Sequence, residues 1–321
     1  MNILDDLLDF LNSSVTPFHG IKECEKILQG YDFKYLPENK DWDIASGKYY
    51  TKRNSSSLIA FNIGEGDYHF QIAASHSDSP TFKVKDNPIL ESGGYLKLNV
   101  EGYGGMINST WFDKPLSLGG RVMVETQAGI ETRLLYIDKD LLIIPNMPIH
   151  LNRDVNKGFA FNNQTDMLPI FSAGGLTLSD FNEMLAKQLR VTQSEIIAKD
   201  LYLVNRQKAV VIGYDNEFIA SGRLDDLECV YTSLRAFVKA ENPGHINVFA
   251  VFDNEEVGSV TKQGAMSTFL SSTLNRINNL LGKSNEDYCK AVAGSILISC
   301  DNAHALHPNH PELFDLVNRP V

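Results

Sequence analysis

The stretch from His245 to Ser259 constrains the fold of this chain more than any other. Residues 246–252 form an apolar run of strand length that contains two valines and two phenylalanines. Such a run is typical of a strand buried on both faces of a parallel sheet. It ends abruptly in Asp253-Asn-Glu-Glu256 and a Gly-Ser turn. Single acids after a strand are usually solvated, but this position, the carboxyl edge of a sheet, is also where open α/β folds build their sites.

The rest of the chain divides by texture into two parts. Two further apolar runs, 69–75 and 295–299, also predict strands. Helical spacing of apolar residues surrounds them and predicts helices that include residues 3–13 and about 265–281. Between about 85 and 220 the sequence changes to Gly-rich turns and short β-like runs. We therefore expect an α/β sheet domain made of residues 1–84 and 221–321, interrupted by an inserted, mainly β domain of residues 85–220.

Side chains of the kind that bind metals directly follow the three predicted strands, and one more stands at a predicted helix start. In chain order they are His76, Asp78, Asp225, Glu255, Glu256 and Asp301. Because the carboxyl ends of parallel neighbours meet at one edge of a sheet, we expect these side chains to converge. Imidazole and carboxylate ligands suit zinc, cobalt or manganese. Several carboxylates at one buried edge would not all stay ionised without a cation, which also favours a metal site.

Two spacings within this set have a physical reason. A carboxylate two residues after an imidazole, as in His76-x-Asp78, can fix the tautomer and orientation of the ring. Neighbouring residues in a turn can point in different directions, so one of Glu255 and Glu256 can bind metal while the other holds an attacking water. A glycosidase is disfavoured, because adjacent carboxylates do not naturally flank a sugar bond at the required ~5–9 Å.

Composition restricts the partners and the compartment. The formal net charge of −11 argues against nucleic acid or an anionic membrane as the main partner, since both need a basic surface. Four scattered cysteines without a C-x-x-C pair predict reduced thiols. The sequence has neither a signal peptide nor a run of about 18 apolar residues. We therefore expect a cytoplasmic protein.

Several short motifs occur in a fixed order through nearly the whole chain. They are Thr16-Pro-Phe-His19, His76-Ser-Asp-Ser-Pro80, Tyr103-Gly-Gly105, Trp111-Phe-Asp-Lys114, Leu118-Gly-Gly-Arg-Val122, Ile149-His-Leu-Asn152, Arg223-Leu-Asp225, Asp253-Asn-Glu-Glu-Val-Gly-Ser259, Asp301-Asn-Ala-His-Ala305 and His307-Pro308. Each motif alone is weak, but their order and spacing together are specific. With these motifs, the sequence resembles the aspartyl aminopeptidase family of dinuclear zinc metallopeptidases.

The resemblance implies a site with two divalent metal ions, most naturally zinc. Asp225 would bridge the two ions, and Glu255 would be the general base on the bridging water. Asp78 would orient an imidazole ligand. The other ligands would be His76, Glu256 and Asp301.

The resemblance also implies a zinc-peptidase-like α/β/α sandwich as catalytic domain, with the inserted β-rich domain making dimer contacts. Family members form large homo-oligomers, commonly dodecamers. His150 resembles a histidine that reaches into the active site of a neighbouring subunit to contact substrate. A histidine simply placed on the surface of the β domain explains His150 equally well, and both readings stay open.

The implied function is a metal-dependent aminopeptidase that removes N-terminal Asp or Glu from peptides. One alternative is a related aminopeptidase or deacylase for neutral substrates, because the ligand set does not separate these. Another is an inactive truncated family member that acts only in assembly or binding. Family members continue beyond the position of Val321 and carry their last metal-binding histidine there. We therefore expect the 321-residue form to lack the complete two-metal site and to have little peptidase activity.

Overall fold

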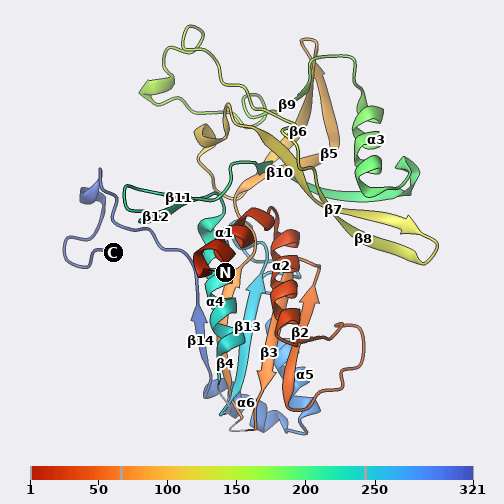
Figure 1. The fold of residues 1–321 in the computed structure, drawn as a ribbon, viewed down its shortest axis with the longest axis vertical. Helices are drawn as coiled ribbons and strands as arrows, with labels where there is room; N and C mark the ends of the chain where they lie inside the picture. The colour runs from red at the N-terminus through yellow and green to blue at the C-terminus, as the bar shows by residue number, and fades with distance from the viewer. Residues whose placement is uncertain (1, 66–67, 242–243, 321) are drawn as a thin grey trace.

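The computed structural model describes residues 2–65, 68–241 and 244–320, and two six-stranded sheets dominate it (Figure 1). The first sheet has the order β1 (Lys34–Tyr35), β2 (Gly47–Arg53), β3 (Ser57–Ile63), β13 (Ile246–Phe252), β4 (Phe70–His76) and β14 (Ile296–Ser299). The second has the order β8 (Gly129–Tyr136), β7 (Leu116–Thr126), β10 (Ile196–Asn205), β5 (Thr81–Ser92), β6 (Tyr95–Tyr103) and β9 (Ile170–Ser172). A separate hairpin pairs β11 (Val210–Ile212) with β12 (Phe218–Ala220).

The central strand of the first sheet is the apolar run that follows His245. All seven residues of β13 are buried, and β13 pairs in parallel with β4, which pairs in parallel with β14. The predicted parallel arrangement of these three strands is therefore confirmed. On its other side β13 is antiparallel to β3, so the sheet is mixed.

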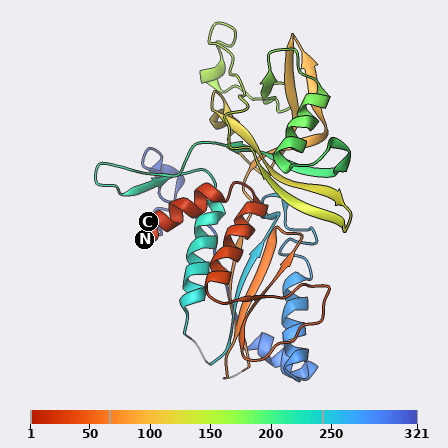
Figure 2. The ribbon, with the colours of Figure 1, turned by 45° about the vertical axis from the view of Figure 1, so that its right-hand side comes forward.

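Helices cover both faces of this sheet (Figure 2). Phe249 and Val251 of β13 pack in one apolar cluster with α1 (Ile3–Ser13), α2 (Pro17–Gly30) and α4 (Leu224–Lys239). Val248, Ala250 and Phe252 pack in another with α5 (Phe269–Leu280) and α6 (Asn285–Ala293). Because successive side chains of a strand point to opposite faces, this alternation makes an α/β/α sandwich, as predicted.

One predicted boundary is wrong. The helix expected from about residue 265 begins only at Phe269. The preceding residues form turns instead, in which the Met266 N–H donates to the Ser259 carbonyl and the Gly264 N–H to that of Thr261. Within the described ranges, no helix has both the length and the apolar character needed to cross a membrane.

The second sheet has its own apolar core, which includes Phe181 and Leu185 of α3 (Leu178–Leu189). The chain passes from the first sheet to the second between His76 and Thr81, slightly before the predicted boundary at 85. It returns through the β11–β12 hairpin to α4. This change of sheet supports the proposed division of the chain, and we keep the name inserted domain for residues 85–220.

Candidate metal centre

The carboxyl ends of β4 and β13 lie side by side and bring their following residues to one place. His76, the last residue of β4, is paired with Phe252, the last residue of β13. The N–H of Ser77 donates to the Phe252 carbonyl at 2.8 Å, which extends this pairing by one residue. The acidic turn after β13 therefore begins next to the buried imidazole of His76.

Three of the predicted ligands meet at this edge. The Nε2 atom of His76 lies 3.2 Å from Oδ1 of Asp225 and 3.6 Å from Oδ1 of Asp301. Together with Asp226, these residues offer ligand atoms that all lie within 4.8 Å of one another. One imidazole nitrogen and several carboxylate oxygens form a donor set that fits zinc.

Asp78 contacts the His76 ring at Nδ1, the nitrogen that faces away from Asp225 and Asp301. The Nδ1 atom of His76 donates to the carbonyl oxygen of Asp78 at 3.0 Å and lies 3.4 Å from Oδ1 of its carboxylate. This contact places the proton on Nδ1 and leaves Nε2 free to face the carboxylate cluster. A metal-binding histidine usually has such a partner on its other nitrogen.

Asp226 belongs to this cluster and was missed by the sequence interpretation. It is fully buried, and its Oδ2 accepts the backbone N–H of His76 at 2.9 Å. Its Oδ1 is buried without an oxygen or nitrogen donor among the described residues, and burial raises the pKa of this carboxyl to about 6. A cation would satisfy this oxygen, which supports a metal at the cluster. The sequence signal for Asp226 is its adjacency to Asp225, which forms an acidic pair like that of Glu255 and Glu256.

The electrostatics of His76 point the same way. Burial alone would lower its pKa, but the hydrogen bond to Asp78 and the charges of Asp226 and Asp225 outweigh burial and raise it to about 9. The surrounding carboxylates therefore stabilise a positive charge at the His76 ring. A divalent cation would supply that charge without a proton on the imidazole.

Glu255 and Glu256 form the start of a short 3-10 helix, η4 (Glu255–Val257), directly after β13. Their backbone N–H groups donate to Oδ1 and Oδ2 of Asp78 at 3.1 and 3.2 Å. Burial, more than the nearby charge of Asp225, raises the pKa of Glu256 to about 7. In the described part of the chain, the compact four-residue cluster includes neither glutamate, so both stand beside it.

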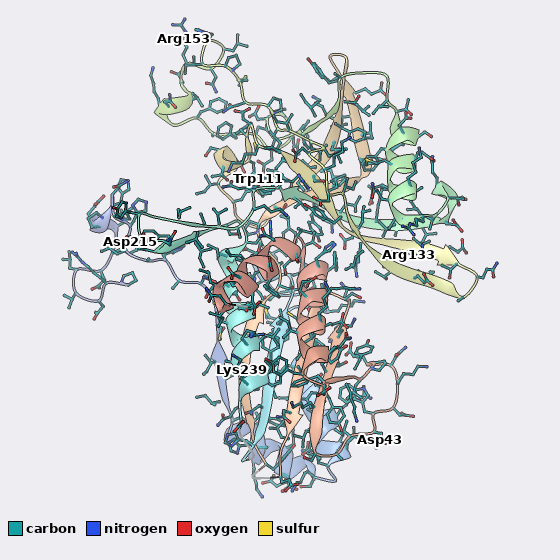
Figure 3. The ribbon with its side chains drawn as sticks, viewed as in Figure 1. Asp43, Trp111, Arg133, Arg153, Asp215 and Lys239 are labelled. Carbon is teal, nitrogen blue, oxygen red and sulfur yellow. The ribbon has the colours of Figure 1, made fainter. Side chains whose placement is uncertain are left out.

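His150 lies elsewhere. It is exposed in the loop between β8 and β9 of the inserted domain, away from the cluster. Its neighbours Ile149 and Leu151 are 48% and 76% exposed, so a large apolar side chain stands on each side of it at the surface. Arg153, further along the same loop, stands at the outer end of the molecule, far from the first sheet (Figure 3).

Known proteins share this chain's sequence and fold. A family profile described as "Aminopeptidase I zinc metalloprotease (M18)" matches residues 10–321. A relative from Clostridium acetobutylicum, "Probable M18 family aminopeptidase 2", is 45% identical over 327 residues, which cover 98% of this chain and 75% of that protein. "Aspartyl aminopeptidase 1" from Schizosaccharomyces pombe is 38% identical over 347 residues, covering 98% of this chain and 73% of that protein.

A solved structure of the S. cerevisiae mApe1 dodecamer matches this chain with a TM-score of 0.87 and 26% sequence identity. The match covers 100% of this chain and 77% of the chain in that structure. The chain thus spans about three quarters of the length of the curated relatives it matches. The profile match over residues 10–321 and these identities decide the family. The chain belongs to the M18 family of aminopeptidase I zinc metalloproteases.

Proposed function

We propose that this protein removes an N-terminal aspartate or glutamate from peptides by hydrolysis. The observation that carries the proposal is the meeting of His76, Asp225 and Asp301 at the sheet edge where Glu255 and Glu256 begin. Two divalent ions would be held there, zinc by the family description, with cobalt and manganese suited to the same ligands.

In this proposal the residues at the edge have separate tasks. Asp225, whose Oδ1 lies 3.2 Å from Nε2 of His76, would be the ligand shared by both ions. His76, Asp301 and Glu256 would be the terminal ligands. When bound, zinc supplies a water of lowered pKa and an electrophile for the scissile carbonyl.

Glu255 is the proposed general base. It takes a proton from the attacking water and gives it to the leaving amine. Its backbone is held by the Asp78 carboxylate, which also holds Glu256 and so keeps the base in register with the ligand. The free α-amino group of a peptide is a cation, and the carboxylates at the edge would attract it, which explains action at chain ends.

The choice of an acidic substrate rests on the relative named aspartyl aminopeptidase. A related aminopeptidase or deacylase for neutral substrates would use the same ligands. A panel of aminoacyl anilides separates the two, because only the first prefers aspartyl and glutamyl anilides. A non-catalytic assembly protein would hydrolyse none of them.

We also propose a homo-oligomer, with a dodecamer as the arrangement suggested by the S. cerevisiae relative. The exposed apolar side chains on each side of His150 support contact with a second copy, in whose active site His150 would meet the substrate. We also propose that the protein is cytoplasmic, where its four scattered cysteines would stay reduced.

The test is Glu255→Gln. In a preparation that hydrolyses an aspartyl anilide, we expect turnover to fall by at least ~100-fold, because the amide cannot accept the proton. Zinc content, measured by mass spectrometry of the purified protein, should stay at the wild-type value. Glu286→Gln on the exposed face of α6 is the matched control and should change neither quantity. Unchanged turnover in Glu255→Gln would remove Glu255 from the role of base.

A further inference from the structure

One side chain of the inserted domain reaches the interior of the metal centre. Tyr103 is the last residue of β6 and pairs with Thr81, the first residue of β5. The base of the β5–β6 hairpin is therefore only a few residues from Asp78 along the chain. Tyr103 is 8% exposed, and its hydroxyl donates to Oδ2 of Asp78 at 2.7 Å.

The hydroxyl of Tyr103 has a second partner. It accepts a hydrogen bond from Nδ2 of Asn254 at 2.8 Å. The Oδ1 atom of Asn254 in turn accepts from Thr261 and Gln263, which fixes the direction of the amide. With Asn254 donating to it, the tyrosine oxygen must use its own proton toward Asp78. Burial, followed by the charges of Asp78 and Asp253, raises the pKa of Tyr103, so this proton stays in place.

Asp78, which accepts this hydrogen bond, connects His76 with the acidic turn. It is fully buried, and its carboxylate accepts the backbone N–H groups of Glu255 and Glu256. Its carbonyl oxygen accepts Nδ1 of His76. Oδ1 of the same carboxylate lies 3.4 Å from Nδ1 of His76, so a rotation of the Asp78 side chain would change its contacts with the imidazole and with both glutamate N–H groups.

The residue after Tyr103 is also in contact with the centre. Gly104 has a φ of +73°, and a Cβ atom added there would lie 2.9 Å from Cβ of Glu256 and 3.2 Å from its Oε2. The chain thus approaches Glu256 more closely than any side chain would allow, in a conformation that favours glycine. Tyr103 and Gly104 therefore both pack directly against the acidic turn.

From these contacts we propose that Tyr103 is a positioning residue for the metal centre. Its hydroxyl holds Asp78 in the orientation that aligns His76 and the acidic turn, so the inserted domain takes part in shaping the zinc site. The inference rests on the proposed function, because it concerns the same His76 and Glu255.

Tyr103→Phe tests the hydroxyl alone. The ring keeps its edge contact with Tyr202, at 5.6 Å between centroids, so the packing is retained. We expect zinc, measured by competition with a chelator, to bind about tenfold more weakly, the low end of the loss for removing a ligand's direct partner, because Tyr103 contacts that partner and not the ligand. Where turnover is measured, kcat should fall while KM stays within about twofold, since Tyr103 acts through Asp78 and not on the peptide.

Tyr202→Phe is the matched control. Tyr202 is equally buried beside Tyr103, at 6% exposure, and its hydroxyl makes no hydrogen bond with any described residue. This control should bind zinc as the wild type does. Substitution of Tyr103 by 4-aminophenylalanine, which restores a donor to the ring, should recover most of the lost zinc affinity.

A double-mutant cycle with Asp78→Asn decides whether Tyr103 acts through Asp78. We expect the double variant to bind zinc no more weakly than Asp78→Asn alone, because the second change removes nothing further. Additive losses, or zinc binding by Tyr103→Phe equal to the wild type, would overturn the inference. A wild-type chain that binds no zinc would instead refute the proposed function.

Discussion

Asp253 is a buried carboxyl, 4% exposed, that the proposed mechanism does not use. Burial, and then the charge of Asp78, raises its pKa from 3.8 to about 7. Between these pH values the folded state holds a proton that the unfolded state has released. The free energy of unfolding should therefore decrease as the pH rises from about 4 to about 7, by about 1.4 kcal/mol per pH unit for one group.

Asp253→Asn removes this dependence. At pH 4 the variant should match the metal-free wild type, and at pH 8 it should be more stable by a few kcal/mol, because the amide is neutral at both pH values. Guanidinium unfolding at pH 4, 6 and 8 measures the difference. Asp215→Asn, at the β11–β12 hairpin (Figure 3), should show no such trend. Equal differences at all three pH values would contradict the prediction.

For single residues, the sequence predicted which side chains belong to the site better than it predicted which of them are buried. His76, Asp225 and Asp301 could be predicted as neighbours, since each stands just after a strand or at a helix start. For Asp226 the only signal was its adjacency to Asp225, because its burial depends on how the chain turns into α4. Tyr103 is separated from Asn254 by 151 residues, and only the folded chain brings their side chains together.

Among the elements, β13 has the largest influence on the site, because the acidic turn continues from it. Phe249 is fully buried and stacks on Phe237 of α4 at 5.9 Å between ring centroids. Phe249→Ala should destabilise the protein by about 3–5 kcal/mol, as expected for a cavity in a core. Phe218→Ala on β12, where the ring is 64% exposed, should cost less than about 0.5 kcal/mol.

Denaturant midpoints of the two phenylalanine variants check this prediction. A loss below about 1 kcal/mol in Phe249→Ala would mean that β13 can repack around the cavity. Zinc affinity should also fall in Phe249→Ala, since the acidic turn and His76 are aligned by β13 and its pairing with β4.

The elements and the parallel pairing of β4 with β13 and β14 were largely predictable, whereas the rest of the arrangement was not. Apolar runs and helical spacing gave β13, β4, β14 and α1 nearly to the residue, because burial repeats with the period of each element. The antiparallel pairing of β3 with β13 depends on contacts between distant residues, which periodicity does not contain. The late start of α5 at Phe269 reflects the turns made by Ser259 and Thr261, which composition did not reveal.

For the whole molecule, the exposed loop around His150 is the proposed contact with a second copy, so self-association is the property to measure. Leu151 is 76% exposed, and a charge there should oppose burial against a second copy. Leu151→Asp should weaken self-association by at least ~10-fold, about 1.4 kcal/mol, in sedimentation velocity at several concentrations. The zinc content should not change. Ile3→Asp on α1, where the side chain is 59% exposed, is the control, and equal effects of both changes would argue against the loop as an interface.

The position of β13 between β3 and β4 has a consequence for synthesis. Both neighbours precede the inserted domain in the chain, whereas β13 follows it, and His76 is 150 residues ahead of its partner Asp226. A nascent chain on the ribosome therefore carries one unpaired edge of β3 and two of β4 while the whole inserted domain is translated. Such edges favour aggregation until β13 and β14 have been made. Asp225 and Asp301 also follow the inserted domain in the chain, so the side chains of the metal centre can meet only after that domain has been translated.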